Sequence, residues 1–343
     1  MNIYDLDIDD LEKYFLSIGD KKFHAKQLFT WLYEKKKTLD EITDIKKETK
    51  EKMKKDFSFK KLDIIKKEND TDVAKYLFKL EDNQLIEAVL MNHDYGISVC
   101  ISSQVGCNMG CKFCESGRRK KVRNLKVSEM VLQILQIEDD IKSRISNIVI
   151  MGIGEPFDNY CNVMKFIKIV NHPNGLKIGS RKITVSTCGI IPKIEEFSNF
   201  SLQVNLAISL HASNDKLRSS LMPINKVYPL DALIRTLKKY IEKTNRRVTF
   251  EYILLDKIND SVENANELAK LIKGMNAYVN LIPYNETENL GFNRSKTIQI
   301  MKFYDILKKN KINVTIRKEF GNNITAACGQ LRSKEEITWN RFI

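Results

Sequence analysis

Three cysteines in one short stretch are the residues of this chain best suited to chemistry. Cys107, Cys111 and Cys114 follow the spacing C-x3-C-x2-C directly after a strand-like run. Thiolates gathered by one loop are typical ligands of zinc and of iron–sulfur clusters. A structural zinc site needs a fourth ligand, and no histidine lies closer to the loop than His93. A [4Fe–4S] cluster held by three cysteines would leave one iron open to a substrate or cofactor. A zinc-stabilised RNA-binding module without catalysis is the alternative.

The composition narrows the class of protein. The chain has 343 residues, of which 43% are hydrophobic and 29% charged, as in globular proteins of about two domains. Lys and Arg number 57 against 44 Asp and Glu, and this net charge of +13 favours a polyanionic partner. No apolar stretch reaches the roughly 18 residues of a membrane span, and the acidic N-terminus is unlike a secretory signal. We therefore expect a cytoplasmic protein, not associated with membranes, whose seven cysteines serve metal binding or catalysis.

The elements that must position the cysteine loop fall into two regions. Residues 1 to about 70 are lysine-rich with apolar residues at helical spacing, which predicts a small helical unit. Short strand-like runs begin at residue 76. After the cysteine loop, amphipathic helices alternate with apolar strands, expected over 148–151, 183–186, 204–210, 247–255, 278–283 and 314–317. This alternation predicts an α/β fold, a partial (β/α) barrel with its chemistry at the carboxyl ends of the strands.

The boundaries follow from the same pattern. We expect a helical N-terminal accessory domain over residues 1–75 and a β-hairpin linker over residues 76–92. The barrel is expected over residues 93–330, followed by a C-terminal tail over residues 331–343.

The sequence around the cysteine loop resembles a known family. The spacing, with an aromatic residue before the last cysteine, is similar to the cluster loop of radical S-adenosylmethionine (SAM) enzymes. Six motifs in order resemble the RlmN-type adenosine methyltransferases of 23S rRNA and tRNA: CISSQVGC (100–107), MGIGEP (151–156), SLH (209–211), LMPIN (221–225), NLIP (280–283) and AACGQL (326–331). KQLFTWL (26–32) is similar to the accessory domain of that family. The resemblance implies a partial (β/α)6-type radical SAM barrel with a small helical N-terminal domain that docks RNA.

The resemblance also implies a cofactor site. Cys107, Cys111 and Cys114 would hold one [4Fe–4S] cluster, whose open iron binds the amino and carboxylate groups of SAM. Residues that would contact SAM lie at or just past the carboxyl ends of the predicted strands, where a barrel has its site. They are Gly154, Glu155, Ser186, Ser209, Leu210, His211 and Asn285.

Three further residues match catalytic positions of the family. Cys328 would take a methyl group from one SAM, and a second SAM would be cleaved to a 5′-deoxyadenosyl radical that activates this methyl group. The resulting carbon radical would add to adenine C2, an electron-poor atom that cannot attack SAM directly. Glu87 would then remove the ring proton, and Cys100 would form a transient disulfide with Cys328 to release the product.

The implied partners are RNA and an electron donor. The substrates would be an adenosine in the peptidyl-transferase region of 23S rRNA and the adenosine beside the anticodon in tRNA. An external donor such as flavodoxin or ferredoxin would supply electrons to a monomer. The alternative within the family is a Cfr-type enzyme, which methylates adenine C8 and confers antibiotic resistance.

Some features carry weaker expectations. The basic run over residues 118–123 follows the cluster loop and is expected to contact phosphate. Cys161 and Cys188 have no implied role and are expected to be small buried hydrophobic side chains. Residues 322–325 are less acidic than the resemblance implies, which bears on the loop before Cys328.

Overall fold

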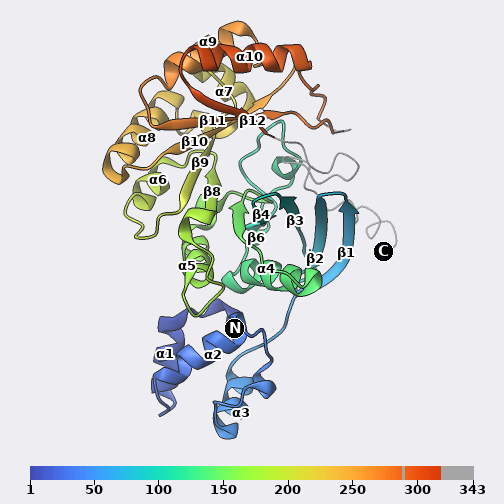
Figure 1. Ribbon diagram of the computed structural model, residues 1–343, viewed down its shortest axis with the longest axis vertical. Helices are drawn as coiled ribbons and strands as arrows, with labels where there is room; N and C mark the ends of the chain where they lie inside the picture. Colours follow the sequence, from blue (N-terminus) through green and yellow to red (C-terminus); the bar gives the residue numbers. More distant parts are fainter. Residues whose placement is uncertain (288–289, 318–343) are drawn as a thin grey trace.

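Figure 1 shows the computed structural model, which describes residues 1–287 and 290–317. Within these residues, ten strands form one mixed sheet in the order β1-β2-β3-β4-β7-β8-β9-β10-β11-β12. Its first strands are antiparallel: β1 (Asp63–Asp70), β2 (Val73–Lys79), β3 (Leu85–His93) and β4 (Gly96–Cys100). From β4 onward the pairing is parallel, through β7 (Asn147–Ile150), β8 (Ile183–Thr187), β9 (Asn205–Ser209), β10 (Val248–Leu254), β11 (Ala277–Pro283) and β12 (Asn313–Ile316). Two short strands, β5 (Gln104–Val105) and β6 (Arg123–Asn124), pair separately.

Helices connect successive parallel strands. They are α4 (Val127–Ile141), α5 (Tyr160–Asn171), α6 (Ile191–Phe197), α7 (Asp215–Leu221), α8 (Leu230–Thr244), α9 (Val262–Leu271) and α10 (Thr297–Lys309). Shorter 3-10 turns are η1 (Ile3–Asp5), η2 (Leu39–Glu41), η3 (Glu115–Arg118), η4 (Pro156–Asn159), η5 (Ser180–Lys182) and η6 (Pro223–Lys226). Because parallel neighbours need a crossover, the strand–helix alternation of the sequence becomes a partial barrel with helices outside. Within the described residues six crossovers join seven parallel strands, so the predicted (β/α)6-type barrel is confirmed.

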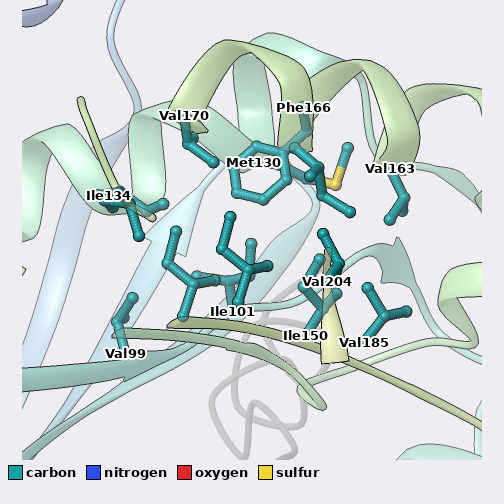
Figure 2. Packing of buried hydrophobic residues seen from close by; sticks show 14 of the residues in the cluster. Val99, Ile101, Met130, Ile134, Ile150, Val163, Phe166, Val170, Val185 and Val204 are labelled. Atoms are coloured by element: carbon teal, nitrogen blue, oxygen red, sulfur yellow. The ribbon is translucent and has the colours of Figure 1, made fainter. Parts of the chain in front are cut away.

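The core lies between the sheet and its outer helices. Helix α8 buries one stripe at spacings of three and four residues, made by Leu230, Leu233, Ile234, Leu237 and Tyr240. Figure 2 shows the same principle beneath α4 and α5, where helix side chains meet strand side chains. The labelled residues are Met130, Ile134, Val163, Phe166 and Val170 from the helices, with Val99, Ile101, Ile150, Val185 and Val204 below them. This packing holds the strand ends in fixed positions.

The N-terminal region is helical, as predicted, and lies against the barrel. It contains α1 (Ile8–Ser17), α2 (Phe23–Tyr33) and α3 (Lys47–Asp56), the blue elements of Figure 1. The Ser128 amide at the start of α4 donates to Asp5 Oδ1 at 2.9 Å. Lys36 pairs with the buried Glu138 at 2.8 Å. These contacts join the helical region to α4, the first crossover helix.

One prediction of secondary structure is wrong. Helix was expected to about residue 70, but residues 63–70 form strand β1 at the edge of the sheet. Its side chains are mostly exposed, and Ile64 and Ile65 face solvent, so the segment lacks the alternation of a half-buried strand. Pairing with β2 makes it a strand, and that contact is not visible in its own sequence.

No helix of residues 1–287 and 290–317 is long and apolar enough to cross a membrane.

Candidate active site

The cysteine loop is held closed by backbone contacts. It connects β5 to η3 and turns back on the segment that follows it. The Cys107 amide donates to the carbonyl oxygen of Arg119 at 2.9 Å, and the Cys114 amide donates to that of Cys111 at 3.2 Å. Gly106 has a φ of +73°, and a Cβ here would lie 2.3 Å from a backbone carbonyl oxygen. Only glycine fits this turn, which brings the loop close to the segment that follows it.

One cavity brings the three cysteines together with the ends of the parallel strands. Cys107, Cys111 and Cys114 line it from the loop. Other lining residues lie at or just beyond the carboxyl ends of β7, β8 and β9 and include Gly154, Glu155, Ser186, Ser209 and His211. The sheet creates this meeting point because parallel strands all end at the same edge.

The remaining predicted residues lie outside the lining of this cavity or outside the described structure. Leu210 is fully buried, and its amide donates to the carbonyl oxygen of Glu251 at 3.0 Å. Asn285 is half-buried just beyond β11. Cys328 lies outside the described residues, as do residues 322–325.

Glu155 is a buried hydrogen-bond acceptor with a fixed orientation. Its carboxylate accepts from the Phe157 amide at 2.9 Å and from the Cys188 amide at 2.8 Å. Burial raises its pKa, although these amide bonds favour the ionised form and limit the rise. Gly154, just before it, has a φ of +109°, and a Cβ there would lie 2.6 Å from Gln104 Cβ. The backbone therefore passes close to β5, and the carboxylate beside it can bind a cationic group.

The donor set fits an iron–sulfur cluster. Burial raises the pKa of Cys107 to about 12 and that of Cys111 well above its usual value, so thiolates here need a neutralising cation. Among residues 1–287 and 290–317, no three His, Cys, Asp or Glu side chains are close enough to share one metal ion. In a cluster each thiolate would bind a different iron, so three cysteines that line one cavity fit this group.

His211 contributes a neutral ring to the cavity. Its Nδ1 accepts from the Ile253 amide at 3.0 Å, and its ring meets Phe113 edge-on. Burial, with a smaller contribution from the charge of Arg218, lowers its pKa to about 3. The backbone at His211 is left-handed, with a φ of +54°. Because Nδ1 is an acceptor, the proton of the neutral ring is on Nε2, which can donate one hydrogen bond.

Glu87 and Cys100 lie on neighbouring strands beside the cavity. Glu87, on β3, is buried, and its carboxylate is 3.7 Å from Lys75 Nζ on β2. Lys75 also pairs with Glu68 on β1 at 2.8 Å. Cys100, on β4, is buried opposite Val89, which shares a face of β3 with Glu87. The predicted base and the predicted resolving thiol therefore belong to one face of the sheet.

Ser102 links these strands to the cavity. Its fully buried hydroxyl donates to the carbonyl oxygen of Glu87 at 2.6 Å and accepts from the Ile153 amide at 3.0 Å. Ile153 immediately precedes Gly154 in the cavity wall. One side chain thus fixes β3 relative to the loop that carries Glu155.

The basic run beside the cysteine loop is partly neutralised by ion pairs within the protein. Arg123 pairs with Asp82 at 2.7 Å and with Glu129 at 2.8 Å. Lys121 pairs with Asp158 at 2.7 Å. These two residues fasten the loop to its surroundings, a role that the sequence pattern did not indicate.

Two cysteines without an implied role differ in their surroundings. Cys188 is buried, as expected, whereas Cys161 is exposed, so the prediction of a buried Cys161 is wrong. Cys161 lies in the first turn of α5, whose buried stripe passes through its neighbour Tyr160 and through Val163 and Met164 instead. A one-residue offset on a helix turns a side chain by about 100°.

Cys188 and Glu251 are among the lining residues that sequence reasoning missed. Cys188 lies two residues beyond Ser186, and its amide fixes Glu155. Glu251 lies on β10, and its carboxylate accepts from Asn280 Nδ2 at 2.8 Å, while burial raises its pKa. A single acidic residue within an otherwise apolar predicted strand was the available signal for Glu251.

Comparison with known proteins agrees with this geometry. Residues 101–269 match the Radical SAM superfamily, and residues 1–58 match the ribosomal RNA large subunit methyltransferase N-terminal domain. Proteins named probable dual-specificity RNA methyltransferase RlmN are similar over nearly the whole chain. The protein of Caldanaerobacter subterraneus is 52% identical over 97% of this chain and 98% of its own length. That of Acholeplasma laidlawii is 51% identical over 97% of this chain and 99% of its own.

A solved structure of a similar protein shares both sequence and fold with this chain. The crystal structure of a radical SAM methyltransferase from Sphaerobacter thermophilus is 40% identical, with a TM-score of 0.93. The match covers 97% of this chain and 100% of that one. The superfamily match implies SAM and an iron–sulfur cluster as cofactors. The chain, with its cysteine loop facing the strand ends of a partial barrel, belongs to the RlmN family of radical SAM methyltransferases.

Proposed function

We propose that this protein methylates C2 of an adenosine in the peptidyl-transferase region of 23S rRNA and of the adenosine beside the anticodon in tRNA. The observation that carries the proposal is the cavity in which three cysteines of one loop face the ends of β7, β8 and β9. The relatives are named dual-specificity RNA methyltransferases, which supports RNA as the substrate class. The net charge of +13 suits a polyanionic substrate.

The residues of the cavity suggest how cofactors would be held. Cys107, Cys111 and Cys114 would bind one [4Fe–4S] cluster, and two SAM molecules would be used per turnover. When bound, the cluster and SAM supply the radical chemistry that side chains cannot. Glu155, oriented by two amides, would accept from the ammonium group of SAM. The remaining SAM contacts would be Gly154, Ser186, Ser209, Leu210, His211 and Asn285.

Proton transfer is assigned to Glu87. Its carboxylate lies 3.7 Å from Lys75 Nζ, and a carboxylate can accept the ring proton of adenine. Cys100 would form the transient disulfide with Cys328, the thiol that carries the methyl group. That Cys100 and Glu87 share a face of the sheet supports their action on the same covalent adduct.

The wider setting is also proposed. A flavodoxin or ferredoxin would deliver electrons to a monomer in the cytoplasm, where ribosomal RNA and tRNA are found. The helical region within residues 1–75 would dock RNA as an accessory domain. Within the basic run, the exposed Lys120 would contact phosphate, since Lys121 and Arg123 already pair within the protein.

Nucleoside mass spectrometry tests this proposal. Total 23S rRNA and tRNA would be compared from cells lacking the protein and from cells complemented with the wild type, Cys111→Ser or Cys161→Ser. We expect 2-methyladenosine in both RNAs with the wild type and with Cys161→Ser, whose thiol is exposed and distant from the loop in sequence. Cys111→Ser should restore none. Recovery of 8-methyladenosine instead would favour the Cfr-type reaction, and no methylated adenosine with the wild type would refute the proposal.

The role of Cys328 has its own test. Cys328→Ala should abolish methylation while the purified protein keeps the iron and sulfide content of the wild type, measured on anaerobically prepared protein. Loss of the cluster in this variant would contradict a methyl-carrying role.

A further inference from the structure

Arg218 places a full positive charge behind the candidate active site. The side chain, on α7, is 0% exposed. Its Nη2 donates to the carbonyl oxygens of Cys188 at 2.6 Å and Ser209 at 3.2 Å, and its Nε donates to that of Leu210 at 3.3 Å. Its Nη1 donates to Asn225 Oδ1 at 2.8 Å. All these acceptors are neutral, and none of the described carboxylates forms an ion pair with this guanidinium.

A buried charge without an opposite charge is costly. Removing an ion from water costs several kcal/mol, and neutral hydrogen bonds offset this only in part. Asp215 acts on Arg218 by its charge without a direct ion pair, and Asn225 bridges the two, because its Nδ2 donates to Asp215 Oδ1 at 2.9 Å. An apolar side chain would avoid this cost. A negative group bound in the cavity would therefore add to the stabilisation of a charge that has no direct ion pair among the described residues.

The contacts of Arg218 connect the two halves of the site. It donates hydrogen bonds to Cys188 and Ser209 at the ends of β8 and β9, and the amide of Cys188 in turn orients Glu155. The helix that carries Arg218 ends at Leu221, whose carbonyl oxygen accepts from the Lys112 amide within the cysteine loop at 3.0 Å. The strand ends and the cysteine loop are therefore both attached to α7.

Arg218 lies directly behind the wall of the cavity, because its Nη2 donates to the carbonyl oxygen of Cys188, a residue of the lining. A cluster held by three thiolates would carry a net negative charge that increases on reduction. That charge is the negative partner that the cavity would acquire when loaded.

We propose that Arg218 is a positioning residue and a fixed counter-charge for the loaded site. It holds the strand ends and the cysteine loop in register, and its field favours the reduced, more negative state of the cluster. Removing the charge should lower the reduction potential and weaken SAM binding. The inference rests on the proposed iron–sulfur site.

The test compares reconstituted wild-type holoprotein with Arg218→Met, Arg218→Gln and Arg218→Lys. Gln keeps a donor for one carbonyl oxygen, and so serves as a second neutral variant if Met fails to fold, whereas Lys keeps the charge. The matched control is Arg246→Met. Arg246 also donates to two backbone carbonyl oxygens, those of Leu202 at 2.7 Å and Val204 at 3.3 Å, but before β9 begins, away from the cavity. Reduction potentials would be measured by anaerobic titration followed by electron paramagnetic resonance, and SAM affinity by equilibrium dialysis.

The neutral variants should show a reduction equilibrium constant that is lower by roughly tenfold, about 59 mV for a one-electron couple. Their SAM affinity should fall as well, while Arg218→Lys recovers most of the potential and Arg246→Met matches the wild type. Wild-type potential in a neutral variant that keeps its cluster, or an equal fall in Arg246→Met, would overturn the inference. A wild-type protein that binds no iron or sulfide would instead refute the proposed function.

Discussion

The titration of His211 offers a direct test of how the site is buried. Its Nδ1 accepts the Ile253 amide, and burial, aided by the charge of Arg218, lowers its pKa from 6.5 to about 3. The folded protein therefore keeps His211 neutral at pH values where the unfolded chain protonates it. The stabilisation from this group is fully present above pH 6.5 and is lost as the pH falls from 6.5 towards 3.

The size of the effect follows from proton linkage. Between pH 6.5 and 3 the unfolded state binds about one more proton than the folded state. The free energy of unfolding then changes by about 1.4 kcal/mol per pH unit. From pH 7 to pH 5, His211 should therefore account for a loss of about 2 kcal/mol.

His211→Asn isolates this contribution. Asparagine tolerates the left-handed backbone, with its φ of +54°, and its Oδ1 can accept the Ile253 amide in place of Nδ1. Urea unfolding of both proteins at pH 7 and pH 5 gives the measurement. The variant should lose about 2 kcal/mol less than the wild type over this interval. Buried carboxylates such as Glu155 and Glu251 titrate in both proteins, so their effect cancels. Equal losses would refute the assignment of a buried, neutral imidazole.

Three further predictions concern buried supports of the site. Ser102→Ala leaves two buried backbone groups without their partner and should cost about 2–4 kcal/mol in urea unfolding. Ser98 is also buried but forms no bridge between two backbone groups in the described structure, so Ser98→Ala should cost less than about 1 kcal/mol. Equal costs for Ser98→Ala and Ser102→Ala would argue against the bridge formed by Ser102. Gly154→Ala, strained at a φ of +109°, should weaken SAM binding roughly tenfold in calorimetry, whereas Gly179→Ala, with open space around its Cβ, should not. Lys75→Met removes the charge between two carboxylates and should lower the free energy of unfolding by about 3–5 kcal/mol. An unchanged free energy of unfolding in this variant would contradict that role.

Much of the candidate site was predictable because its signals are local. Cys107, Cys111 and Cys114 lie within one loop, so their spacing alone places three thiols together. Gly154, Ser186 and the other predicted contacts follow apolar strands, and parallel strands end at a common edge. The alternation of strands and helices likewise predicted the barrel, since the spacing of apolar residues along each helix or strand reflects burial of that element alone.

The residues that sequence reasoning missed depend on contacts between distant segments. Arg218 lies in a short helix where a charged residue predicts a solvent-exposed face, yet four neutral acceptors surround it. Cys188 was expected only to fill space, but its amide orients Glu155 from 33 residues away in sequence. Nothing in the local pattern of either segment encodes these partners.

The sequence by itself thus determined the family, the barrel and the grouping of three cysteines in one loop, because short-range spacing and periodic burial carry that information. Only the tertiary structure decided that residues 63–70 join the sheet edge, that Cys161 faces solvent and that Arg218 is enclosed. These outcomes depend on which surfaces meet after folding. A strand of exposed residues needs a partner to become a strand, and a buried charge needs its acceptors assembled around it.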